Sequence, residues 1–156
     1  MFRCKRAITI AVLVLASIGA RTAGARTPER LFLPLSLDQA MALAAKNRRI
    51  VFVDFSTAWC GACKRLDEDT WTNGKVVEQL KQKTIPLKLD GDKDRNSRDK
   101  YKIDAYPTLL FLNPDGSILA RVVGYQIPAR FIATLQGVLT GNGAGSREPK
   151  RVDGDH

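Results

Sequence analysis

The sequence predicts an α/β fold in which helices cover both faces of a mixed central β-sheet. Segments rich in β-branched and aromatic residues alternate with segments whose apolar residues recur every three or four positions. The last two strand-like segments are separated only by an Asn-Pro-Asp-Gly turn, which predicts an antiparallel hairpin, whereas helical segments separate the earlier ones. With 156 residues, of which 44% are hydrophobic and 26% charged, the chain has room for one domain of ordinary size.

The first two elements are a helix over 37–47 and a strand over 50–55. Ser36 begins the helix in a capping box with Gln39, and the apolar residues that follow recur at helical spacing. The strand is β-branched and aromatic except at Asp54, which indicates burial on both faces. An acid in such a strand is unfavourable unless it has a partner or a function.

Helical residues run from 60 to about 70, break off, and resume over 75–83. The next strand covers residues 84–89. Pro86 cannot donate a hydrogen bond to a neighbouring strand, so we expect it at the start of this strand or on an unpaired side. A polar, turn-rich stretch then leads to a short helix over 98–102.

The C-terminal half of the domain is a hairpin followed by a helix. An apolar strand over 109–112 precedes the strong turn, and the chain returns as a strand over 117–123 that ends at Gly124. Pro128 suits the first turn of the last helix, whose apolar residues extend to Leu139.

The two ends of the chain differ from this domain, which we expect over residues 36–140. Residues 1–25 combine basic residues, an apolar run and a small-x-small cleavage site, which together predict an export signal peptide. The run is shorter than the ~17–25 residues that span a bilayer, although retention as an uncleaved anchor is the alternative. Residues 26–35 are interpreted as a lead-in with a short edge strand through 31–33, and residues 141–156 as a disordered tail.

The formal net charge of +9 does not by itself indicate a nucleic-acid-binding protein. Four basic residues and no acid lie in residues 1–25, and elsewhere basic and acidic residues are mixed, as in 64–69 and 90–95. This mixture is typical of a solvated surface. We therefore expect no nucleic-acid partner and a protein that acts as a monomer.

Removal of the signal peptide would discard Cys4 and leave two cysteines, Cys60 and Cys63. A disulfide between them closes too short a loop to stabilise a fold substantially. The single histidine is His156 in the tail, so we expect no four-ligand zinc site, no other metal site and no cofactor. The spacing of the pair suits redox chemistry better than it suits a structural staple.

Cys60 lies at the predicted start of a helix, where unpaired amides and the helix dipole favour a thiolate. It is therefore predicted to be the nucleophile. Cys63 lies one turn further along the same helix face and is predicted to be the resolving thiol. In this scheme Cys60 attacks a disulfide of a target protein, and Cys63 then releases the reduced target while closing the Cys60–Cys63 disulfide.

The chain resembles the thioredoxin family over roughly residues 37–139. The resemblance is carried by three motifs: Asp54-Phe55, Trp59-Cys60-Gly61-Ala62-Cys63-Lys64 and Tyr106-Pro107-Thr108. It implies a thioredoxin fold in which Pro107 is in cis and packs against the thiol pair. The backbone beside Pro107 would then be free to pair with an extended substrate.

The same resemblance implies roles for further residues. Asp54 matches the family's buried acid, which assists proton transfer from the resolving cysteine, and Lys88 matches the lysine that faces this acid. Trp59, Tyr106 and Gly124 match residues of the substrate-binding surface around the nucleophile.

The chain also departs from cytosolic thioredoxins. Gly61-Ala62 replaces Gly-Pro between the cysteines, and residues 67–76 resemble the C-terminal periplasmic domain of DsbD-type transmembrane reductases and related exported proteins. Histidine between the cysteines is common in strongly oxidising relatives and does not occur here. These departures favour a reductive role. Trp71, which lies within the distinctive stretch, is interpreted as a packing residue.

These features lead to the hypothesis of an exported thiol-disulfide oxidoreductase that reduces or exchanges disulfides in other exported proteins. It would be periplasmic if the source is a Gram-negative bacterium. Its partners would be disulfide-containing exported proteins and an external thiol electron donor, such as a membrane reductase. Two alternatives remain: a non-catalytic binding or assembly module, and an oxidase or isomerase of the same fold.

Overall fold

The computed structural model describes residues 31–141, so the predicted signal peptide, half of the lead-in and nearly all of the predicted tail lie outside the described residues. The elements are α1 (Leu37–Asn47), β1 (Ile50–Ser56), α2 (Gly61–Arg65), the π-helix η2 (Leu66–Thr70), α3 (Gly74–Lys83), β2 (Thr84–Asp90), α4 (Arg95–Lys100), β3 (Thr108–Leu112), β4 (Ile118–Val123) and α5 (Pro128–Leu139). Among them, no helix is long and apolar enough to cross a membrane.

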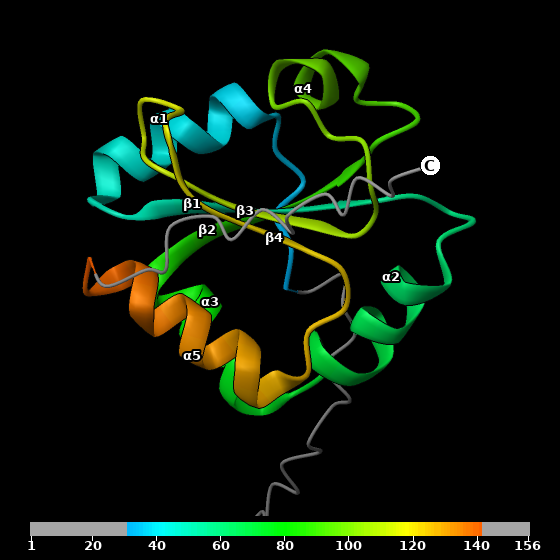
Figure 1. The fold of residues 1–156 in the computed structure, drawn as a ribbon. Helices are drawn as coiled ribbons and strands as arrows, with labels where there is room; N and C mark the ends of the chain where they lie inside the picture. Colours follow the sequence, from blue (N-terminus) through cyan, green and yellow to red (C-terminus); the bar gives the residue numbers. More distant parts are fainter. Residues whose placement is uncertain (1–30, 142–156) are drawn as a thin grey trace, which may run out of the picture.

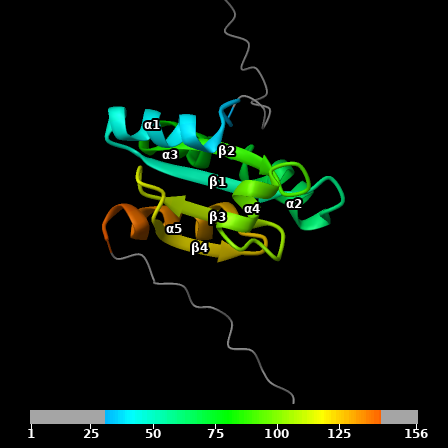
Figure 2. The ribbon, with the colours of Figure 1, turned by 90° about the horizontal axis from the view of Figure 1, so that it is seen from above.

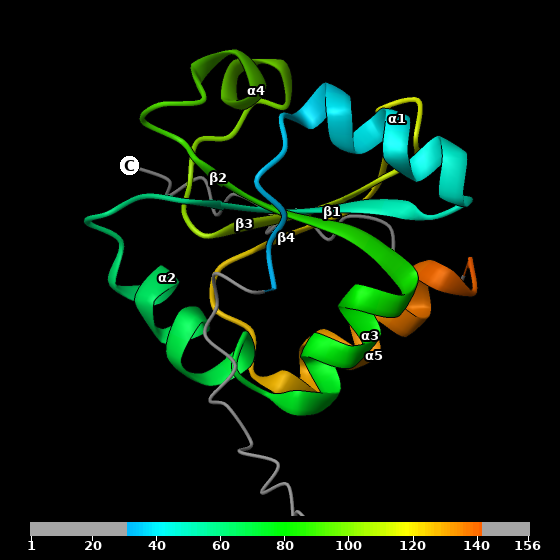
Figure 3. The same cartoon turned by 180° about the vertical axis from the view of Figure 1, so that it is seen from behind.

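The four strands form one mixed sheet in the order β2-β1-β3-β4, as Figure 2 shows. Strand β1 pairs in parallel with β2 and antiparallel with β3, and β3 and β4 form the predicted hairpin. Helices α1 and α4 lie on one face, and α2, α3 and α5 lie on the other (Figures 1 and 3). The predicted α/β architecture is therefore confirmed.

The central strand separates two hydrophobic cores of different character. Its side chains alternate between the faces, so Val51 and Val53 join the largely aliphatic core beneath α1, while Phe52 joins the core beneath α3 and α5. The second core contains a cluster of aromatic residues among aliphatic ones, with the rings of Phe52, Trp71 and Phe131 packed at centroid distances of 5.0–5.6 Å. Asp54 follows Phe52 by two residues and therefore faces the same side of the sheet.

Local sequence signals fix several element boundaries. Ser36 and Gln39 form the predicted capping box, in which each side chain bonds the backbone amide of the other residue. Leu33 donates its amide to the carbonyl of Pro86 at 2.9 Å. This carbonyl points away from β1, so the position without an N–H group lies on the outer edge of β2, as expected from the proline.

Three local predictions are corrected by the structure. Residues 31 and 32 form a turn and a bend, and residue 33 belongs to no regular element, so the predicted edge strand is not formed. The short helix predicted over 98–102 begins earlier, as α4, because the turn-forming residues before it continue directly into helical hydrogen bonds, such as that from Arg98 N–H to Asp94 O. The helix predicted from 60 to 70 is divided, since its second half is the π-helix η2, in which Trp71 N–H donates to Leu66 O at 2.8 Å.

The capping box makes a measurable contribution to stability. Replacement Ser36→Ala leaves the Gln39 amide without its partner, and we expect the free energy of unfolding to fall by about 1 kcal/mol in urea titrations. Ser97→Ala, inside α4, is the control and should leave stability within about 0.5 kcal/mol of the wild type. Equal stability of the wild type and Ser36→Ala would contradict this account of α1.

Candidate active site

The two cysteines are joined by a disulfide just beyond the end of β1. Their Cα atoms lie 5.3 Å apart, and Cys60 and Cys63 are 5% and 2% exposed. Cys60 is the N-cap residue of α2, and its Sγ accepts a hydrogen bond of 3.1 Å from the Cys63 amide. The sulfur of Cys60 therefore lies in a position where a backbone N–H group can stabilise a thiolate.

Asp54 is fully buried on β1, the strand that precedes Cys60. One carboxylate oxygen, Oδ2, accepts a hydrogen bond of 3.0 Å from Trp71 Nε1 and lies 3.3 Å from Lys88 Nζ. The other oxygen, Oδ1, is buried and has no hydrogen-bond partner among the residues that the structure describes. A buried acceptor of this kind is uncommon in folded proteins and is frequently functional.

Burial raises the pKa of Asp54 from its ordinary value of 3.8 to about 6. The positive charge of Lys88 opposes this rise, the negative charge of Asp67 adds to it, and the hydrogen bond from Trp71 opposes it. Desolvation outweighs the favourable partners because the carboxylate has lost its water shell on every side. Asp54 is therefore able to take up and release a proton close to neutral pH.

Lys88 lies between two carboxylates. The family resemblance implies that it faces Asp54, and in the structure it lies close to Asp54 and also forms an ion pair with Asp67. The side chains of Lys88 and Asp67 remain 26% and 33% exposed. Asp67 was not identified from the sequence, because the π-helical turn after Leu66 determines which side chains of this segment face β2.

Trp71 does more than the packing role assigned from the sequence. It is fully buried in the aromatic core and also supplies the hydrogen bond to Asp54. Two general rules could have indicated this contact. A buried acid needs a donor, and a buried tryptophan needs an acceptor for its indole N–H.

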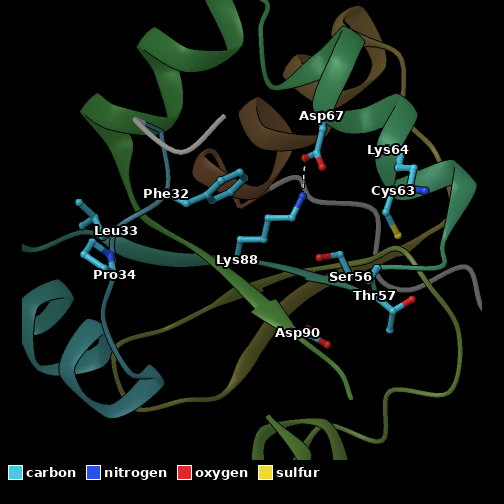
Figure 4. Close-up of a pocket in the computed structure, with 11 residues that line it drawn as sticks. Phe32, Leu33, Pro34, Ser56, Thr57, Cys63, Lys64, Asp67, Lys88 and Asp90 are labelled. Carbon is cyan, nitrogen blue, oxygen red and sulfur yellow. Dashed lines mark hydrogen bonds and ion pairs between the residues drawn. The ribbon is translucent and has the colours of Figure 1, made fainter. Parts of the chain in front are cut away.

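A groove of about 650 Å³ is open to solvent and is lined in part by Lys88 and Asp67 (Figure 4). Cys63 and Thr57 line one side of the groove, and Phe32 from the lead-in lines another. Asp67 and Lys88 meet across the groove, as the dashed line in Figure 4 marks. Within residues 31–141, no group of histidine, cysteine or acidic side chains is arranged to hold a metal ion.

The residues expected at the substrate-binding surface lie at the same end of the sheet. Phe55 pairs with Thr108, so Pro107 lies beside the end of β1 that leads to Cys60. The Tyr106–Pro107 bond is cis, and the Gly124 amide donates to Pro107 O at 2.8 Å. Gly124 has a φ of +91°, which favours glycine at this position.

Trp59 and Tyr106 form an exposed aromatic pair at this surface. Their rings meet edge to face at a centroid distance of 5.7 Å, and Trp59 is 68% exposed. Trp59 Nε1 donates to Asp92 Oδ2 at 3.0 Å, a contact that the sequence did not reveal. The residues proposed from the sequence fall into two connected groups. Cys63, which is bonded to Cys60, lines the same groove as Lys88, and Lys88 pairs with Asp54. Trp59 contacts Tyr106, whose neighbour Pro107 accepts a hydrogen bond from Gly124.

A disulfide in which one sulfur caps a helix after a buried strand is an arrangement suited to thiol-disulfide exchange. The sequence profile described as "Thioredoxin-like domain" matches residues 37–139. The chain belongs to this family, and the thioredoxin fold implied by the sequence motifs is confirmed.

Curated relatives share the domain but are much longer proteins. The chain is similar to the thiol:disulfide interchange protein DsbD of Ralstonia nicotianae (28% identity over 66% of this chain) and of Vibrio vulnificus (30% over 72%). It is also similar to protein disulfide-isomerase 5-2 of Arabidopsis thaliana, with 41% identity over 40% of this chain. The chain covers only 18%, 20% and 14% of these three proteins, respectively.

Solved structures of similar size agree with the fold. A putative disulphide-isomerase from Bacteroides thetaiotaomicron is 33% identical, with a TM-score of 0.60 over 74% of this chain and 94% of that one. A thioredoxin from Thermus thermophilus superposes with a TM-score of 0.62 over 69% of this chain and 87% of that one, at 24% identity. The second likeness supports the fold alone.

The raised pKa of Asp54 predicts a distinctive dependence of stability on pH. Because the folded state holds this proton up to about pH 6 and the unfolded state releases it near 3.8, folding stability falls as the pH rises between these values. Replacement Asp54→Asn removes this loss and keeps an oxygen acceptor for Trp71. We expect the variant to be more stable at pH 8 by about 1–3 kcal/mol in urea titrations.

Below about pH 3 the advantage should disappear, because Asp54 is then neutral in both states. Asp104→Asn, at an exposed position, is the matched control and should follow the wild type at every pH. An advantage of Asp54→Asn that did not change between pH 4 and pH 8 would show that the carboxylate is not the group responsible.

Proposed function

We propose that the protein is an exported thiol-disulfide oxidoreductase that reduces or exchanges disulfides in other exported proteins. The observation that carries this proposal is the combination of the Cys60–Cys63 disulfide at the start of α2 with Asp54, a buried acid on the preceding strand whose Oδ1 has no hydrogen-bond partner among the described residues. A disulfide that served stability alone would need neither a helix N-cap position for one sulfur nor a proton acceptor nearby.

In the reductive direction, the Cys60 thiolate attacks one sulfur of a target disulfide. The target S–S bond breaks, its departing sulfur takes up a proton, and Cys60 becomes joined to the target in a mixed disulfide. Cys63 then loses its proton and attacks Cys60 Sγ, which releases the second target sulfur as a thiol. The target has gained two electrons and two protons, and an external thiol donor must reduce the Cys60–Cys63 disulfide before the next cycle.

Asp54 acts in the second half of this cycle as the acceptor of the Cys63 proton. Its pKa of about 6 makes it mostly ionised at neutral pH, yet basic enough to accept a proton transiently. Lys88 and Trp71 hold Oδ2, so Oδ1 is the oxygen available to the proton. The groove beside Lys88 and Asp67 supplies a route for the proton to return to solvent.

The proposed export and direction rest on separate observations. The N-terminal 25 residues have the composition of an export signal, and the relatives in Ralstonia and Vibrio are named thiol:disulfide interchange proteins. Gly61-Ala62 between the cysteines and the DsbD-like stretch after them favour reduction. The partners would be disulfide-containing exported proteins and an external thiol electron donor, such as a membrane reductase.

Catalysis is tested by insulin reduction with dithiothreitol as the electron donor. We expect the mature protein to accelerate precipitation of the insulin B chain and Cys60→Ser to lose this acceleration, because the nucleophile is then absent. A wild-type protein that performs no better than Cys60→Ser would overturn the proposed activity and favour a non-catalytic binding module.

Partner trapping with Cys63→Ser tests both the substrates and the direction of exchange. Without the resolving thiol, mixed disulfides on Cys60 should persist, and several exported proteins should be captured. A double variant with Cys60→Ser should capture none, while capture of a single protein would favour a dedicated assembly module. A reduction potential near about −270 mV would support the reductase, and one near about −120 mV would instead support an oxidase.

A further inference from the structure

Gly91, in the loop after β2, lies against the hydroxyl end of the Tyr106 side chain. A Cβ atom added at Gly91 would lie 2.0 Å from the Tyr106 hydroxyl oxygen and 2.4 Å from the ring carbon that bears it. These distances are far inside van der Waals contact. Gly91 does not have a positive φ, so the ring requires a glycine here for space and not for backbone conformation.

The backbone around Gly91 is held on several sides. Its amide donates to Ser56 O at 2.9 Å, which fixes it to the end of β1, and the carboxylates of Asp90 and Asp94 accept backbone amides of the same loop. Arg98 approaches the Gly91 carbonyl from α4. A side chain at position 91 would therefore displace the Tyr106 ring rather than the loop.

Tyr106 in turn supports the exposed Trp59. The two rings form the edge-to-face pair described above, and Asp92, next to Gly91, holds the Trp59 indole by its N–H group. We call Trp59 and Tyr106 together the aromatic wall. Gly91 thus leaves the space that Tyr106 occupies, and Asp92 holds Trp59 by a hydrogen bond.

We propose that Gly91 is a specificity-determining residue, because it seats Tyr106 so that the aromatic wall stands rigidly beside Cys60. This inference rests on the proposed thiol-disulfide exchange. A wall that is already ordered binds the polypeptide on either side of a target cysteine, especially apolar side chains, without first ordering its own rings. A small-molecule disulfide has no flanking residues that could contact the aromatic wall. Gly91 therefore favours polypeptide disulfides over small ones.

The test compares Gly91→Ala with Gly74→Ala, in which the added Cβ meets nothing within 4 Å. Each variant reduces insulin and hydroxyethyl disulfide under steady-state conditions. We expect Gly91→Ala to raise KM for insulin roughly 2- to 10-fold, the range expected from the loss of one aromatic contact, while kcat and the rate with hydroxyethyl disulfide stay within about twofold. Gly74→Ala should match the wild type with both substrates.

A second pair of variants tests whether Gly91 acts through Tyr106. In a Tyr106→Ala background the space is already open, so adding Gly91→Ala should not raise KM for insulin further. The double variant also relieves the clash and should recover any loss of folding seen in Gly91→Ala. Additive effects on KM, or an equal loss with both substrates, would overturn the inference. A wild-type protein that reduces neither substrate would instead overturn the proposed function on which it depends.

Discussion

The burial of one carboxylate governs the organisation of this molecule. Asp54 lies on the central strand with no exposed surface, on the face of the sheet whose core combines aliphatic side chains with the rings of Phe52, Trp71 and Phe131. A buried acid of this kind is tolerated only when charged and hydrogen-bonding groups surround it. Lys88 from β2 and Trp71 from the end of η2 meet this requirement at one carboxylate oxygen, Oδ2, while Oδ1 has no hydrogen-bond partner among the described residues.

The same requirement explains why the helix after the cysteines is irregular. The change from α- to π-helical hydrogen bonding at Leu66 adds a residue to the turn. It brings Asp67 to Lys88 on one side and Trp71 to Asp54 on the other. Tyr125 and Thr70 then fasten this segment to the loop after β4, through hydrogen bonds to Asp69 and to Gln126 O. The irregular turn thereby links the two groups of site residues.

Most of the correct predictions of elements and site residues rest on patterns among residues that are close in the sequence. The capping box at Ser36 and the alternation of apolar segments located α1 and the strands to within a residue or two, because these signals act locally. The positions of Cys60, Asp54 and Pro107 followed from short motifs. The contacts of Asp67 depend on the register of the π-helical turn. The contact between Gly91 and Tyr106 joins two loops that meet only in the folded chain. No local sequence pattern predicts either of them.

The outer edge of β2 has a consequence for how the domain behaves among other proteins. An edge strand with free amide and carbonyl groups invites pairing with a second chain. Here Pro86 has no amide to offer, and Leu33 already occupies its carbonyl. The proposed substrates of this protein are disulfide-bonded chains that are partly unfolded. At the outer edge of β2 such chains have fewer backbone groups with which to form a β-sheet. The protein can therefore contact them at its active site with a lower risk of aggregation at this edge.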